Sequence, residues 1–216
     1  MNNTLATTKQ KIIWFMAIFY ILVIARVLWY IAIDAILSEP LGFFSSNLNR
    51  AMIWILPPVL YLRYVDKVPP TRYLKLTTSL KEGLIWSVGV AIFGIVWQLG
   101  ALLFKLDTIG KPDLLDLLSL VTVPVCEEIM MRGFILGKLS ELISFRKALI
   151  LTSLFFYSVH FPGWIMISHL SPWLMVRYAV SVVFIVGMGG AWLTRKSNSL
   201  YPAMILHAVN NFIAGI

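Results

Sequence analysis

Three short polar motifs interrupt apolar stretches of this sequence. Their chemically active residues are Glu127, Glu128 and Arg132 in the first motif, His160 in the second, and His207 and Asn211 in the third. An ionisable side chain within a lipid bilayer raises the free energy of a protein unless it faces the interior of a helix bundle or a water-filled cavity. Each motif is therefore a candidate functional site.

The spacing within each motif predicts which residues share a helix face. Glu128 and Arg132 are four residues apart, so we expect them to be neighbours and to form a buried ion pair. Glu127 projects about 100° away from Glu128 and can face a cavity instead. The same four-residue spacing separates Phe156 from His160 and His207 from Asn211. Each of these helices therefore carries its polar groups along one stripe.

These residue types can hydrolyse a peptide bond if their helices bring them together. A carboxylate in a medium of low dielectric constant becomes more basic, so Glu127 could take a proton from water and return it to a leaving amine. The N–H groups of imidazole and carboxamide side chains, here His160, His207 and Asn211, can stabilise an oxyanion. The alternative is a zinc site, because one Glu and two His suit zinc with a bound water. The residues alone leave both chemistries open.

The ordered set Glu-Glu-x-x-x-Arg, Phe-x-x-x-His and His-x-x-x-Asn resembles the CPBP family of intramembrane endopeptidases, also called the CAAX-protease and bacteriocin-processing or Abi family. The resemblance covers residues 114–216. It implies that Glu127 is the catalytic base that activates water. It also implies that Glu128 and Arg132 give this base structural and electrostatic support.

The resemblance further implies roles for the other motif residues. His160 is implied as a second water-positioning or catalytic group, and His207 and Asn211 as oxyanion stabilisers. The CAAX-prenyl branch of the family is similar to a glutamate-type protease without a catalytic metal, so no cofactor is expected. If a metal such as zinc is present, Glu127, His160 and His207 are its expected ligands.

The composition excludes an ordinary water-soluble domain. The chain has 216 residues, of which 59% are hydrophobic and 13% charged, whereas soluble domains are about 25% charged. Its mean hydropathy is +0.84. The net charge of +8 comes from short basic clusters between apolar runs, a pattern typical of membrane anchors and not of nucleic-acid binding. The lipid bilayer is therefore an expected partner.

The apolar runs predict an all-α, polytopic transmembrane helix bundle in a single domain, residues 1–216, with about seven to eight spans. The expected runs are Ile12–Ile36, Ala51–Leu62, Leu84–Phe104, Leu114–Leu136, Ala148–Ile167, Trp173–Leu193 and Leu200–Ile216. A span needs about 20 apolar residues. The stretch from Phe161 to Ser171 has no Lys or Arg and could form an additional re-entrant or interfacial segment.

The basic residues predict the orientation of this bundle. Most Lys and Arg fall in connections on the side of the N-terminus, whereas only Arg50, Lys105 and Lys111 fall on the other side. Basic connections stay cytoplasmic, so we expect a multi-pass protein of the cell membrane with a cytoplasmic N-terminus. A bacterial plasma membrane is expected from the short chain. Because Glu127 lies toward the cytoplasmic side of its span, we expect the cavity to open there.

Several residues have a plainer interpretation than catalysis. Cys126 could be a nucleophile, but a lone buried thiol usually behaves as a small hydrophobic side chain. His169 matches no motif and is interpreted as interfacial. Asn210 points about 100° away from Asn211 and is interpreted as a packing or capping amide.

The expected function is hydrolysis of a membrane-associated peptide, which could be prenylated or a leader, pheromone or bacteriocin-type peptide. Two alternatives remain. One is a non-enzymatic bacteriocin immunity protein that acts by binding in the membrane, and the other is a proton-coupled transporter that uses the buried carboxylates. The sequence leaves the oligomeric state open.

Overall fold

The computed structural model describes residues 2–103, 113–166 and 171–214, and within these ranges the chain is helical with no strand. The predicted all-α bundle is confirmed. The N-terminal elements are α1 (Asn2–Ala32), η1 (Asp34–Ile36), α2 (Glu39–Trp54), α3 (Leu56–Leu60), η2 (Tyr61–Val65), α4 (Pro70–Tyr73) and α5 (Leu80–Leu103). The C-terminal elements are α6 (Leu114–Glu128), η3 (Ile129–Ile135), α7 (Leu136–Leu142), α8 (Phe145–Ser158), α9 (Phe161–Met166), α10 (Pro172–Tyr178), η4 (Ala179–Gly189), α11 (Gly190–Ser197) and α12 (Tyr201–Ala214).

Four helical segments in the described ranges are long and apolar enough to cross a membrane. They are Thr7–Ile36, Leu80–Gly100, Phe145–Met166 and Pro172–Ser197. Only 22–28% of the most apolar window of each is buried inside the protein, so most of their apolar side chains face outward. A surface of this kind requires lipid as its solvent. The protein is therefore a membrane protein.

The other three expected runs are also helical, but each differs from a simple span. The run that begins at Leu114 continues through α6, η3 and α7 to Leu142 and carries several charged side chains, including Glu127 and Glu128. Helix α12 has only 14 residues, fewer than the roughly 20 that a span needs. The run from Ala51 to Leu62 is divided between α2, α3 and η2.

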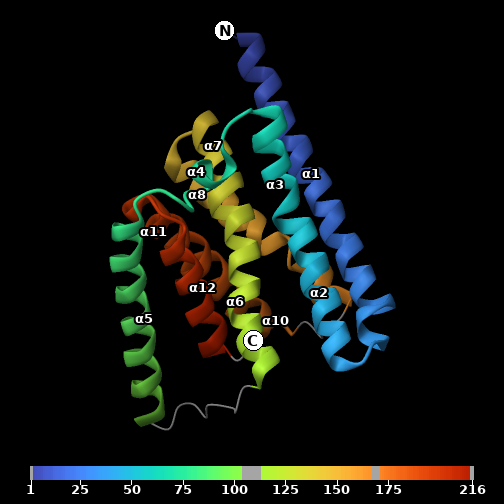
Figure 1. Ribbon diagram of the computed structural model, residues 1–216, viewed down its shortest axis with the longest axis vertical. Helices are drawn as coiled ribbons and strands as arrows, with labels where there is room; N and C mark the ends of the chain where they lie inside the picture. Colours follow the sequence, from blue (N-terminus) through green and yellow to red (C-terminus); the bar gives the residue numbers. More distant parts are fainter. Residues whose placement is uncertain (1, 104–112, 167–170, 215–216) are drawn as a thin grey trace.

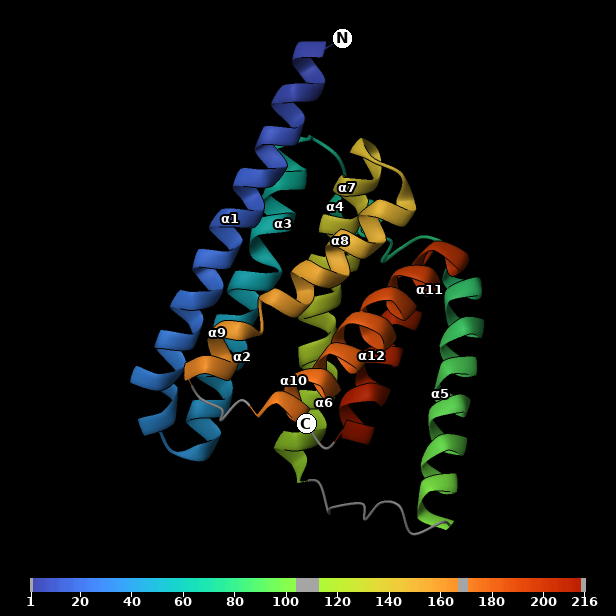
Figure 2. The ribbon, with the colours of Figure 1, turned by 180° about the vertical axis from the view of Figure 1, so that it is seen from behind.

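The α6–η3–α7 segment lies in the middle of the bundle (Figure 1). Helices α1, α2 and α3 lie on one side of it, and α12, α11 and α5 lie on the other, while α8, α9 and α10 are seen from behind (Figure 2). Pro124 lies inside α6, and the π-helical segment η3 follows directly after Glu128. Proline removes one backbone donor from a helix, and π-helical turns are frequent at functional sites.

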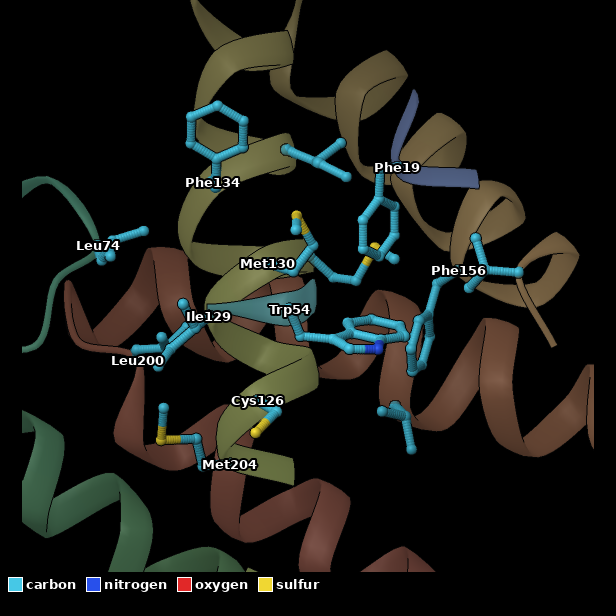
Figure 3. Packing of buried hydrophobic residues seen from close by; sticks show 14 of the residues in the cluster. Phe19, Trp54, Leu74, Cys126, Ile129, Met130, Phe134, Phe156, Leu200 and Met204 are labelled. Carbon is cyan, nitrogen blue, oxygen red and sulfur yellow. The ribbon is translucent and has the colours of Figure 1, made fainter. Parts of the chain in front are cut away.

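Aromatic and sulfur-containing side chains pack around the middle of this central segment (Figure 3). Phe19 lies edge-on to Trp54, with ring centroids 5.0 Å apart, and both belong to one buried cluster with Met130 and Phe156. Helices in lipid gain little from hydrophobic burial against one another, so close van der Waals packing must hold them together. This cluster joins α1, α2, η3 and α8, the elements around the polar motifs.

Helix α5 closes the far side of the bundle by packing on α12 (Figure 1). A Cβ atom added at Gly94 would lie 2.5 Å from Cγ1 of Val209, so only glycine permits this close approach. Small residues at such crossings are typical of membrane helices. Since α12 also packs on α6, its polar stripe is held against the Glu127–Glu128 motif.

Candidate active site

The two adjacent glutamates at the end of α6 have different surroundings. Glu127 is 7% exposed and lines a cavity of about 640 Å³. Glu128 is fully buried and does not line this cavity. The helical spacing predicted this divergence, because consecutive residues project about 100° apart. One carboxylate is therefore accessible to a ligand, while the other is enclosed by protein.

Glu128 is held by the arginine one turn along the same helical segment. Oε1 of Glu128 accepts a hydrogen bond from Nη1 of Arg132 at 2.9 Å, and both side chains are almost completely buried. The Arg132 guanidinium also lies over the ring of Phe156, 4.5 Å from its centroid. This geometry confirms the ion pair predicted from the four-residue spacing.

His207 lies between the two glutamates. Its Nδ1 is 2.9 Å from Oε1 of Glu128, and its Nε2 is 3.9 Å from Oε2 of Glu127. Since a carboxylate can only accept, the Nδ1–H donates to Glu128, and Nε2 is then the nitrogen on the side of Glu127. The sequence predicted no contact between His207 and Glu128, because the two residues are 79 positions apart.

His160 follows the end of α8 and lines the same cavity as Glu127. Its Nδ1 lies 2.7 Å from the carbonyl oxygen of Phe156, so the Nδ1–H donates there and Nε2 is left as the second ring nitrogen. The ring lies edge-on to Phe156 and tilted against Trp164, with centroid distances of 4.8 and 5.3 Å. The expected extension of this span beyond His160 is confirmed as far as Met166, with a turn at residues 159 and 160.

The third motif also reaches the cavity. Asn211 is 9% exposed and lines it together with His207. Asn210 lines it as well, and its Oδ1 accepts a hydrogen bond of 3.0 Å from the hydroxyl of Ser181 on η4. The interhelical bond fits the interpretation of Asn210 as a packing amide, but its position on the cavity wall was not expected.

The cavity therefore contains one or more side chains from each of the three motifs. Glu127, His160, His207 and Asn211 all line it, as their predicted convergence requires. Its volume is within the range of about 300–1,000 Å³ that is usual for small-molecule sites. The arrangement supplies a carboxylate, two imidazoles and a carboxamide in a space bounded by apolar helices.

Helix α2 forms another wall, which was not predicted from the sequence. Arg50 was expected in a connection between spans, on the side opposite the N-terminus. It lies instead near the end of α2 and lines the cavity with Asn47. The hydroxyl of Thr122 on α6 donates to Oδ1 of Asn47 at 2.7 Å and so joins the two walls. Nε of Arg50 is buried, and no residue in the described ranges accepts its hydrogen. The sequence does contain a signal for this wall. Phe43, Asn47 and Arg50 are four and three residues apart, a spacing that places them on one face of a helix.

The lining also shows where the cavity leads. It extends to Asp34 and Glu39 at the connection between α1 and α2. This end of the bundle is opposite to α4 and α7 (Figures 1 and 2), where the basic residues Arg72 and Lys138 lie. The expected opening on the side of the basic segments is therefore not supported by this lining.

The possible metal ligands and the single thiol can also be placed in the structure. In the part of the chain that the structure describes, no group of three or more His, Cys, Asp or Glu side chains is placed to hold a metal ion. Glu127, His160 and His207 thus do not form a ligand set in this arrangement. Cys126 is a free, buried thiol within the apolar cluster. His169 falls outside the described residues.

Comparison with known families matches residues 112–213 to the model described as Type II CAAX prenyl endopeptidase Rce1-like. The matched segment is a little less than half of the chain and contains all three motifs. It is consistent with the CPBP resemblance found from those motifs, which is thereby confirmed. No curated protein and no solved structure matched the chain.

Proposed function

We propose that this protein, whose residues 112–213 match the family model described as Type II CAAX prenyl endopeptidase Rce1-like, is an intramembrane endopeptidase in which Glu127 activates the attacking water. The observation that carries the proposal is the single cavity lined by Glu127, His160, His207 and Asn211. The family match supports a protease activity in general. The glutamate mechanism is our assignment.

The proposed reaction begins at the Glu127 carboxylate. This group accepts a proton from a water molecule while the water oxygen forms a bond to the peptide carbonyl carbon. The carbonyl oxygen becomes an oxyanion. Glu127 then passes its proton to the peptide nitrogen, the C–N bond breaks, and a carboxylic acid and an amine leave.

The second carboxylate serves the first indirectly in this mechanism. Glu128 carries the charge that matches Arg132 and also accepts from Nδ1 of His207. A hydrogen bond at one ring nitrogen fixes the orientation of the other, so Glu128 holds Nε2 of His207 close to Glu127. We assign Glu128 and Arg132 a positioning role, because neither lies at the reacting atoms.

The oxyanion requires hydrogen-bond donors. The carboxamide of Asn211 carries two N–H donors and lines the cavity, and His207 can donate from Nε2 when its ring is doubly protonated. We assign both residues to the oxyanion. His160, whose Nδ1 is bound to the backbone of Phe156, keeps Nε2 for the attacking water, and we assign it to water positioning.

The proposed substrate is a membrane-associated peptide. The family description favours a prenylated peptide, and leader, pheromone or bacteriocin-type peptides are the other candidates. We place the protein in the cell membrane as a multi-pass protein with its N-terminus in the cytoplasm, on the basis of the basic segments. With this orientation, the Asp34 and Glu39 end of the cavity lies toward the outer leaflet.

The test is Glu127→Gln in protein reconstituted into liposomes, with cleavage of a prenylated peptide followed by mass spectrometry. We expect no cleavage, because the amide cannot accept the proton of water. Glu82→Gln is the matched control, since Glu82 is an exposed carboxylate in the first turn of α5. Cleavage retained in Glu127→Gln contradicts the mechanism. If Glu127→Gln retains bacteriocin immunity, the binding function is supported instead. If Glu127→Gln loses proton-coupled uptake, the transport function is supported.

A further inference from the structure

A second cavity, of about 490 Å³, lies among residues of η3, α7, α11 and the segment after α4. Its walls include Lys75, Arg132, Thr194 and Arg195. It does not share a lining residue with the cavity around Glu127. Arg195 is exposed, whereas Arg132 and Thr194 are each 2% exposed, so the cavity runs from the surface into the protein.

The charge of this cavity is unbalanced. Three cations line it, Lys75, Arg132 and Arg195, against one carboxylate, Glu141. Glu141 already accepts hydrogen bonds from Lys138 and Tyr73, and the charge of Arg132 is matched by Glu128. Lys75 and Arg195 form no ion pair with any residue that the structure describes. Two cations therefore lack a counter-ion.

These two cations affect each other. Burial, followed by the positive charge of Arg195, lowers the pKa of Lys75 below its ordinary value. The position of Lys75 is fixed, because its backbone has a left-handed φ of 57° and its carbonyl oxygen accepts from the backbone N–H of Leu200 at 3.2 Å. Like charges that are held together in this way are stabilised by an anion between them.

The inner wall of the cavity supplies unused hydrogen-bonding groups. Within the described part of the chain, neither Nη2 of Arg132 nor Oγ1 of Thr194 has a hydrogen-bond partner, and both atoms are buried. Buried polar groups in folded proteins are nearly always satisfied by protein, water or a ligand. An anion with several acceptor oxygens matches a guanidinium, a hydroxyl and an ammonium group at once.

We propose that this second cavity binds a phosphate group, with its oxygens accepting from Lys75, Arg132, Thr194 and Arg195. The phosphate could belong to a lipid headgroup or be free in solution, and both sources present the same oxygens. A lipid phosphate is compatible with the position of the cavity among the basic segments, because such segments contact anionic headgroups. The proposal does not depend on the proteolytic function.

Thermal unfolding of the full-length protein in detergent tests this inference. Inorganic phosphate, compared with chloride at equal ionic strength, should raise the unfolding midpoint to a saturating value. Arg195→Gln and Thr194→Val should each weaken the apparent phosphate affinity by about tenfold or more. Thr194→Val preserves the size of the side chain and removes only the hydroxyl. The matched control is Lys196→Gln, since Lys196 is the exposed neighbour of Arg195 and does not line the cavity.

The two sources of phosphate are separated in nanodiscs. The lipid source is the phosphate of an anionic phospholipid, since the choline of phosphatidylcholine neutralises the charge of its own phosphate. If such a lipid occupies the cavity, phosphatidylglycerol nanodiscs should stabilise the wild type relative to pure phosphatidylcholine nanodiscs. This gain should be larger for the wild type than for Arg195→Gln, and inorganic phosphate added to phosphatidylglycerol nanodiscs should have no further effect. If free phosphate is the ligand, its effect should be equal in both kinds of nanodisc. The inference is overturned if phosphate acts no differently from chloride and phosphatidylglycerol has no effect, or if Lys196→Gln weakens the response as much as Arg195→Gln does.

Discussion

The imidazole of His207 and the carboxylate of Glu128 are joined by a contact of 2.9 Å between Nδ1 and Oε1. The same carboxylate oxygen accepts from Arg132. One buried oxygen thus connects α12 to η3 and fixes the ring that lies beside Glu127. The conformation of the candidate active site depends on a residue that does not face its cavity.

Replacing Glu128 by Gln should therefore destabilise the protein as well as inactivate it. The substitution preserves the shape of the side chain but leaves the Arg132 guanidinium buried without a matching charge, which costs about 3–5 kcal/mol. Denaturation in mixed detergent micelles measures the change in unfolding free energy. The double substitution Glu128→Leu with Arg132→Leu removes both charges and should be less destabilising than Glu128→Gln. A Glu128→Gln protein as stable as the wild type would show that the pair contributes nothing.

The neighbouring asparagines of α12 provide a matched comparison. Asn211→Ala should lower kcat by about 10²–10³-fold with little change in KM, because loss of one oxyanion donor affects mainly the transition state. Asn210→Ala removes the hydrogen bond from Ser181 and should lower kcat much less. Steady-state kinetics on one peptide substrate measures both. Equal losses in the two variants would assign the amides to packing.

Removal of divalent metals should leave peptide cleavage unchanged if Glu127 acts on water directly. Purified protein is treated with a chelator, its metal content is measured by elemental analysis, and its activity is compared before and after. Zinc added back at a stoichiometric amount should not increase the rate. Activity that disappears with the metal and returns with zinc would instead support the alternative in which Glu127, His160 and His207 rearrange around an ion.

Stability should fall at alkaline pH through a polar cluster outside the membrane spans. Burial and the hydrogen bond to Glu141 raise the pKa of Tyr73. Burial alone would lower the pKa of Lys138, but its contacts with Asp66 and Glu141 outweigh burial and raise it. A raised pKa in the folded state means that the folded protein holds the proton more tightly. The stabilisation is thus complete below about pH 10 and is lost as the pH rises further.

Unfolding measured between about pH 9 and about pH 12 checks this expectation. Tyr73→Phe should make the decline in stability shallower than in the wild type. Tyr64→Phe removes a phenol that is 67% exposed and should follow the wild-type curve. An unchanged slope in Tyr73→Phe would mean that the phenol does not take part.

Helical spacing explains why much of the candidate site could be predicted from the sequence. The pairing of Glu128 with Arg132 and the separate direction of Glu127 depend only on geometry within one turn. The contact between His207 and Glu128 could not be predicted in the same way, because it depends on how α12 packs against α6. That packing is set by features such as the close approach of Gly94 to Val209, which no local pattern reveals.

The wall formed by α2 was missed for a different reason. Residues 37–50 contain Ser, Asn, Glu and Arg, and such a composition is typical of a connection between spans. The structure instead places these polar groups on a helix that begins at Glu39 and faces the cavity. Polarity was interpreted as exposure to water outside the membrane, although it can equally indicate an internal aqueous surface.

Helix α2 lies outside the matched residues 112–213, yet it supplies Asn47 and Arg50 to the cavity. The cavity is consequently lined from both halves of the chain, although only the second half matches the family. Substitutions at Asn47 and Arg50 can therefore change the shape and charge of the cavity while Glu127, His160, His207 and Asn211 stay the same.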